Sequence, residues 1–135
     1  MKFIGIDGRE KNLKHAKKYL IDWQKSSRSK FQLNVKKFLE PYWSNDIVFE
    51  EFRIAGTRLT FDFYNANKKI AIEVQGQQHT KYIKFFHGNR LKYLQQLKRD
   101  EKKLEFCEKN NIKLIEIYHT DNISKDFFEQ QNIYL

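Results

Sequence analysis

The chain has 135 residues, with 26 Lys and Arg against 17 Asp and Glu, which gives a formal net charge of +9. This length favours a single domain that buries a core without disulfides, and the lone Cys107 excludes an intramolecular disulfide framework and fits a reducing compartment. No apolar run approaches the about 20 residues of a membrane span, and the first residues lack a signal-peptide pattern, so we expect a soluble, cytoplasmic protein with no membrane partner. The charge favours a polyanion such as DNA as partner, although a Lys-rich host composition would give the same balance.

Residues 1–28 predict a basic N-terminal arm ahead of the main fold. Residues 1–8 are typical of a short extended segment that closes with an Asp-Gly turn. Residues 10–25 then show helical spacing of apolar side chains and predict a basic amphipathic helix. Its apolar positions include Leu13, Ala16, Leu20 and Ile21. Lys14 and Lys18 on this helix are candidate contacts to a DNA backbone, although a solvated helix that packs through its leucines explains the same pattern.

A second helix is predicted over residues 30–43, and a strand is predicted over residues 47–53. The helical period is carried by Phe31, Val35, Phe38, Leu39 and Tyr42. The Ser-rich residues 26–29 supply side chains that can cap the first turn of this helix. Residues 55–57 are expected to form the turn before two central strands.

The two central strands are predicted over residues 59–64 and 70–75, joined by a polar turn. In the first strand we expect one face to carry Leu59, Phe61 and Phe63 and the other to carry Thr60, Asp62 and Tyr64. In the second strand, Glu73 shares its face with Gln75. A hairpin would place Asp62 and Glu73 on one face of neighbouring strands, which predicts a paired-carboxylate site.

Two carboxylates in this arrangement predict a site for Mg²⁺, which Mn²⁺ could replace. Mg²⁺ prefers hard oxygen ligands, and we expect Asp62, Glu73 and the backbone carbonyl of Val74 to supply them. Such an ion would activate water for the hydrolysis of a phosphodiester bond. Gln75 is a candidate for orienting the water or the phosphate, and His79, just past the strand, is a candidate general acid or base.

The segment after the central strands, residues 77–88, interleaves basic and aromatic side chains. Lys81 and Lys84 are candidate phosphate contacts there, while the phenylalanines of the segment are expected to be core anchors rather than base-stacking groups. A long helix is predicted over residues 90–110, and Arg90 at its start is a further candidate for binding the DNA backbone.

Asp100 falls inside the apolar stripe predicted for this long helix. The stripe consists of Tyr93, Leu97, Leu104 and Cys107. A carboxylate on a core-facing side is costly unless it is paired or coordinating, and a salt bridge to Lys103 and an active-site role explain its position equally well. A strand over residues 112–118 and a short helix over residues 123–131 complete the chain. The order predicts one α/β or α+β domain over residues 1–135.

Four stretches of the sequence resemble the PD-(D/E)XK nuclease superfamily: F-D-F, I-E-V-Q-G-Q-Q-H, K-R-D-E-K-K and N-N-I-K-L-I-E-I. Within that superfamily they are similar to very-short-patch-repair-like and phage homing-type (EDxHD-like) endonucleases. The predicted elements over residues 29–118 are similar to the family's restriction-endonuclease-like αβββαβ core, a mixed sheet flanked by helices, and residues 119–135 add a C-terminal helix. The resemblance implies a Mg²⁺-dependent DNA endonuclease from a bacterium or a phage-infected cell.

Carried over residue by residue, the resemblance assigns the metal-binding acids to Asp62 and Glu73. It matches His79 to the His that follows the motif Gly. It also matches Asp100 and Lys103 to the acid and the lysine of the later helix, and Lys103 is further expected to contact the DNA backbone.

Two positions depart from the family pattern. Gln75 stands where the motif Lys is expected, a replacement that some restriction enzymes of this superfamily also carry. Gln32 stands where the first helix would carry a Glu, a loss that Glu50 or Glu51 could offset, and it remains a candidate for positioning water or phosphate. These departures leave open a catalytically degenerate DNA-binding protein, and a nuclease selective for junctions or flaps fits the same residues. A chain of this length would need a homo-oligomer or a partner protein to read a long DNA site.

Overall fold

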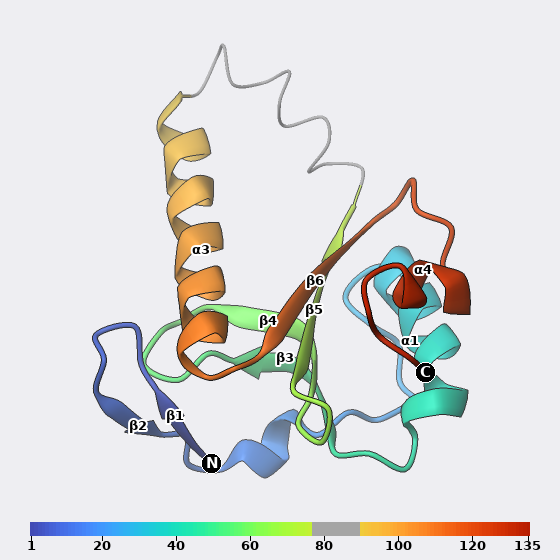
Figure 1. The fold of residues 1–135 in the computed structure, drawn as a ribbon, viewed down its shortest axis with the longest axis horizontal. Coiled ribbons are helices and arrows are strands. Elements are labelled where there is room, and N and C mark those ends of the chain that lie inside the picture. The colour runs from blue at the N-terminus through green and yellow to red at the C-terminus, as the bar shows by residue number, and fades with distance from the viewer. Residues whose placement is uncertain (77–89) are drawn as a thin grey trace.

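The computed structural model describes residues 1–76 and 90–135, which form an α+β arrangement (Figure 1). The described elements are β1 (Lys2–Ile4), β2 (Glu10–Asn12), the 3-10 helix η1 (Ala16–Tyr19), α1 (Lys30–Trp43), β3 (Val48–Arg53), β4 (Thr60–Asn65), β5 (Ile70–Gln75), α3 (Arg90–Lys109), β6 (Lys113–Tyr118) and α4 (Lys125–Glu129). The predicted mixture of helices and strands is therefore confirmed. In this part of the chain no helix combines the length and the hydropathy needed to span a membrane.

The central sheet of the described chain has four strands in the order β3-β4-β5-β6. β3, β4 and β5 pair antiparallel, and β6 joins β5 in parallel. A second sheet of two strands forms where β1 pairs antiparallel with β2. The chain therefore passes through α3 between its two parallel neighbours, β5 and β6.

Among residues 1–76 and 90–135, two apolar cores lie on opposite faces of the central sheet. Ala71 and Ile72 are neighbours on β5 and belong to different cores, as expected when side chains alternate across a strand. One core packs the β1–β2 hairpin and the end of α3 against the sheet, through Phe3 and Phe106 among others. The other core packs α1 and α4 against the sheet, with Trp43 fully buried. Figure 1 shows the hairpin with α3 on one side of the sheet and α1 with α4 on the other.

α1 has the bounds that its apolar period and its Ser-rich N-terminus predict. Ser29 is the N-cap, and its hydroxyl accepts a hydrogen bond from the Gln32 N–H at 3.1 Å. The four strands of the central sheet begin or end within one residue of the predicted bounds. The C-terminal helix predicted over residues 123–131 is shorter and covers Lys125–Glu129.

The N-terminal helix predicted over residues 10–25 is wrong. Its first residues form β2, which pairs with β1, and η1 supplies only a short 3-10 turn further on. Gly8, at a φ of 81°, lets the chain reverse between the two strands. The hairpin buries Phe3, whose ring centroid lies 6.0 Å from that of Phe52 and 5.4 Å from that of Phe106. Burial of this aromatic ring stabilises the hairpin over a solvated helix.

The apolar stripe predicted for α3 is also wrong in part. Leu97 and Leu104 are 39% and 51% exposed, whereas Phe106 and Cys107 are buried. The partly buried positions on the earlier turns are Tyr93, Gln96, Asp100 and Lys103. At Lys103 this side of the helix meets Glu73 of the sheet rather than an apolar core.

Candidate active site

Along β3 and β4, the alternation of side chains between the two faces of the sheet is interrupted at Glu51 and Asp62. The flanking ladder pairs are Glu50–Phe63 and Phe52–Phe61. Glu51 has a φ of 50°, in the left-handed region that is uncommon for residues other than glycine. The predicted shared face of Leu59, Phe61 and Phe63 is therefore wrong, because Leu59 and Phe61 line one core and Phe63 lies in the other.

β4 and β5 diverge at the two predicted acids. Their antiparallel pairing stops at Phe63 and Ile72, and the next residues toward the open end are Asp62 and Glu73. The carboxylates replace the missing ladder bonds. The Asp62 N–H donates to Glu73 Oε2 at 3.3 Å, and the Val74 N–H donates to Asp62 Oδ2 at 2.8 Å. The structure thus brings the two acids together where the sheet opens.

Glu73 is buried against α3, and Lys103 of that helix forms an ion pair with its Oε1 atom. Burial raises the pKa of Glu73 to about 8, the negative charge of Asp62 adds to the rise, and the Lys103 ammonium opposes it. Two carboxylates that share a desolvated position with one ammonium favour the binding of a further cation, which would lower the repulsion between them.

A network of charged and polar side chains joins α1 to β3. The Gln32 amide Nε2 donates to Glu50 Oε2 and to Glu51 Oε1, both at 3.0 Å. Lys36 is 1% exposed, lies 2.8 Å from Glu50 Oε1 and donates to the Lys25 carbonyl at 3.0 Å. Gln32, a sequence candidate for positioning water or phosphate, is itself buried and holds two glutamates.

Glu51 connects this network to Asp62 and Glu73, which we call the acid pair. Burial raises the pKa of the Glu51 carboxyl, the hydrogen bond from Gln32 opposes the rise, and the charge of Asp62 adds to it. The β3–β4 register sets Glu51 and Asp62 between the same two ladder pairs. Glu51, Asp62 and Glu73 therefore follow one another across β3, β4 and β5.

The donor set of the acid pair fits Mg²⁺. Carboxylate oxygens are the hard ligands this ion prefers, and a divalent cation would offset the repulsion from Asp62 that helps to raise the pKa of the buried Glu73. Within residues 1–76 and 90–135, no group of three or more His, Cys, Asp or Glu side chains is arranged to hold a metal ion. Val74, predicted to offer its carbonyl, contributes its N–H to Asp62.

The remaining predicted residues lie at varied distances from this pair. Gln75 is two residues beyond Glu73 on β5, partly buried, and its carbonyl accepts from the His119 N–H at 3.0 Å. Asp100 accepts a hydrogen bond from Gln96 at 3.0 Å, while Lys103, its predicted partner, pairs with Glu73. Arg90, Lys14 and Lys18 are exposed cations. The predicted roles of His79, Lys81 and Lys84 fall on residues outside the described ranges.

The buried network on α1 was missed by the sequence reasoning, although a signal for it exists. Gln32 and Lys36 share the helical period of the buried Val35, Leu39 and Trp43. Polar residues on the core-facing side of a helix indicate buried groups that have hydrogen-bond or ion-pair partners. The Lys103–Glu73 ion pair had no such signal, because it joins segments 30 residues apart.

Comparison with known proteins gives little further information. No family model matches the chain, and no solved structure matches it significantly. The chain is similar to uncharacterized protein 033L of Invertebrate iridescent virus 3, with 30% identity over 88 residues. The match covers 62% of this chain and 45% of that protein, so the chain spans less than half the length of this relative.

Proposed function

We propose that the protein is a Mg²⁺-dependent DNA endonuclease built on a restriction-endonuclease-like core. The order α1-β3-β4-β5-α3-β6 supports this proposal, because it agrees with the αβββαβ order to which the sequence is similar. The parallel pairing of β6 with β5 in an otherwise antiparallel sheet adds to the support.

The observation that carries the proposal is the meeting of Asp62, Glu73 and Lys103 where β4 and β5 diverge. Phosphodiester hydrolysis needs hard ligands for a divalent cation and positive charge near the phosphate oxygens. Two carboxylates and an ammonium from three separate elements supply both requirements at one position.

Each side chain of this group has a defined part in the proposed reaction. Asp62 and Glu73 would hold Mg²⁺, which when bound supplies an activated water and neutralises charge on the phosphate. Lys103 orients Glu73 through one N–H and retains two further donors for a phosphate oxygen. Lys103 would thereby provide the positive charge that Gln75 lacks.

One observation favours a second function, a catalytically degenerate DNA-binding protein. Both carboxylates already have partners within the chain, since Asp62 accepts from the Val74 N–H and Glu73 pairs with Lys103. Internal pairing of this kind would let the fold persist without a metal ion. The net charge of +9 would still favour a nucleic-acid partner.

Cleavage of supercoiled plasmid with Mg²⁺ or Mn²⁺ tests the proposal, with the wild type beside Asp62→Asn. We expect nicked or linear product from the wild type and a loss of at least about 100-fold in the variant, because a carboxylate ligand is removed. DNA binding measured in EDTA is expected to change little.

Asp126→Asn, an exposed acid on α4, is the matched control and is expected to cleave like the wild type. A wild type that binds DNA in a salt-sensitive manner but yields no product with either metal would support the degenerate binder. Equal cleavage by Asp62→Asn and the wild type would place any nuclease activity elsewhere.

A further inference from the structure

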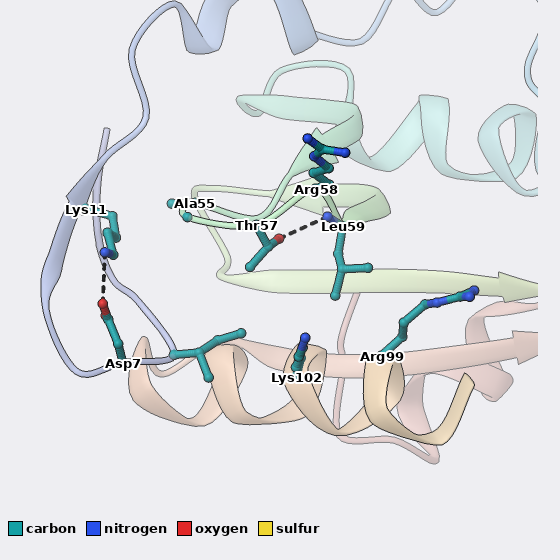
Figure 2. A pocket seen from close by; sticks show the side chains of 10 residues that line it. Asp7, Lys11, Ala55, Thr57, Arg58, Leu59, Arg99 and Lys102 are labelled. Atoms are coloured by element: carbon teal, nitrogen blue, oxygen red, sulfur yellow. Dashed lines mark hydrogen bonds and ion pairs between the residues drawn. The ribbon is translucent and has the colours of Figure 1, made fainter. Parts of the chain in front are cut away.

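A pocket lined by cations lies between the β1–β2 hairpin, the turn from β3 to β4 and α3 (Figure 2). Its volume is about 870 Å³, within the roughly 300–1,000 Å³ of ligand pockets. Its charged lining residues are Asp7, Lys11, Arg58, Arg99 and Lys102. Figure 2 shows Arg99 and Lys102 on one side, Arg58 on the opposite side, and the Asp7–Lys11 pair at the hairpin end. We call this site the basic pocket.

The single carboxylate of the basic pocket is already neutralised. Asp7 accepts from the Arg9 N–H at 3.0 Å and from Lys11 Nζ at 3.0 Å, and these hydrogen bonds hold the pKa of Asp7 below its usual value. Within the described part of the chain, no carboxylate forms an ion pair with Arg58, Arg99 or Lys102. Three cations of the pocket are therefore available to an anion.

The Lys11 side chain and the turn that carries Arg58 are both closely packed at the basic pocket. A Cβ atom at Gly5 would lie 2.8 Å from Lys11 Cε, and one at Gly56 would lie 3.3 Å from it, so the Lys11 stem fits between two glycines. The Thr57 hydroxyl donates to the Ile54 carbonyl at 2.9 Å and accepts from the Leu59 N–H at 3.0 Å. The turn that carries Arg58 is thus held in place before any ligand binds.

The basic pocket also adjoins the acid pair along two elements. Leu59 lines the pocket and Asp62 follows three residues later, about 10 Å along an extended chain. Arg99 lines the pocket and Lys103 lies one helical turn further along α3. A polyanion that reaches the acid pair can therefore reach the pocket as well.

We propose that the basic pocket binds a phosphate group of the DNA strand, a few nucleotides from the phosphate that lies at the acid pair. The identity of this ligand rests on the proposed function. A guanidinium group can form two parallel hydrogen bonds to phosphate oxygens, and an ammonium group adds a compact positive charge. The pocket thereby fixes the position of the strand relative to Asp62 and Glu73.

DNA binding without divalent metal tests this inference. Affinity for a labelled duplex is measured in EDTA over a range of salt concentrations for the wild type, Arg58→Gln and Lys102→Gln. Each variant is expected to reduce the slope of log affinity against log salt by about 1, because each removes one phosphate contact. The two residues are exposed and lie on different elements, and thermal unfolding checks that each variant is folded.

Lys98→Gln is the matched control, since Lys98 is an exposed cation of α3 that does not line the pocket. It removes the same charge and is expected to change the slope by less than half as much. Pocket variants that bind no worse than Lys98→Gln would overturn the inference, because net charge alone would then explain the binding.

Duplexes with a 5′-phosphate and with a 5′-hydroxyl distinguish the two sources of the phosphate. Equal affinities, both lowered by the pocket variants, identify an internal phosphodiester. A higher affinity for the 5′-phosphate that both variants abolish identifies a strand end. A wild type that binds through the pocket but never cleaves keeps this inference and removes the endonuclease proposal. If the wild type cleaves DNA but the pocket variants bind DNA like Lys98→Gln, the endonuclease proposal is kept and this inference is overturned.

Discussion

At the scale of single residues, Glu73 has the most unusual electrostatics of the candidate active site. An unfolded chain gives its carboxyl a pKa near 4.5, whereas burial beside Asp62 raises the folded pKa to about 8. Between these pH values the folded state holds a proton that the unfolded state releases. The free energy of unfolding therefore falls as the pH rises through this window, and the loss is complete above about pH 8.

Glu73→Gln removes this pH-dependent fall in the free energy of unfolding, because the amide stays neutral and still accepts a hydrogen bond from Lys103. Relative to the wild type, the variant is therefore expected to become more stable as the pH rises from about 4.5 to about 8. The difference in the free energy of unfolding should grow by on the order of a few kcal/mol. Urea unfolding in EDTA at several pH values measures the difference. Cys107 does not interfere, because burial raises its pKa to about 12.

Glu108→Gln, an exposed substitution on α3, controls for a simple change of net charge and should show no such growth with pH. Parallel pH curves for Glu73→Gln and the wild type would mean that Glu73 is ionised throughout. In that case Lys103 would outweigh the burial of the carboxylate.

At the scale of elements, Asn110 holds the β1–β2 hairpin to the end of α3. The Ile4 N–H donates to Asn110 Oδ1 at 2.7 Å, and Asn110 Nδ2 donates to the Ile4 carbonyl at 2.8 Å. Asn110→Ala is expected to lower the free energy of unfolding by about 1–3 kcal/mol, because two backbone groups lose their partners. Urea unfolding measures this loss, and amide exchange at Ile4 should become faster.

Asn122→Ala, at an exposed position, is the comparison for this variant and should leave both measurements unchanged. If exchange at Ile4 stays slow in Asn110→Ala, the packing of Phe3 alone would hold the hairpin. The prediction bears on function as well, since Lys11 of the basic pocket lies on this hairpin.

Elements with a local signal could be predicted from the sequence. α1 combines an apolar period with the Ser29 cap, and each strand of the central sheet has a run of alternating or apolar residues between turns. The hairpin could not be predicted, because residues 10–25 share a helical period by chance and the burial of Phe3 depends on partners far along the chain. The outward leucines of α3 were misjudged for the same reason, since contacts with the sheet decide which side of a helix is buried.

In the candidate site, too, features set by neighbouring residues could be predicted, and contacts between distant segments could not. The pairing of Asp62 with Glu73 follows from two strands and a turn, so the sequence could indicate it. The left-handed backbone of Glu51 and the ion pair between Lys103 and Glu73 depend on segments that meet only in the folded chain. The phase of β4 changes at Asp62, and a strict two-residue period could not anticipate that change.

At the scale of the whole molecule, the net positive charge repels cations, whereas the acid pair attracts them. A protein with a net charge of +9 repels divalent cations in general, so non-specific binding of Mg²⁺ is disfavoured. A specific stabilisation by Mg²⁺ must therefore come from a local group of acids. The carboxyl groups of the buried Glu73 and the partly buried Asp62 form such a group where the sheet opens.

A Mg²⁺ ion held by the acid pair in the folded state alone, as proposed, is expected to raise the free energy of unfolding by about 1.4 kcal/mol at ten times its dissociation constant. Thermal unfolding at constant ionic strength should show a rise of a few degrees that EDTA reverses. Asp62→Asn should lose this rise, whereas Glu101→Gln, an exposed substitution on α3, should keep it. An equal rise in Asp62→Asn would show that the cation binds elsewhere, and the acid pair would then act only as a buried link between β4 and β5.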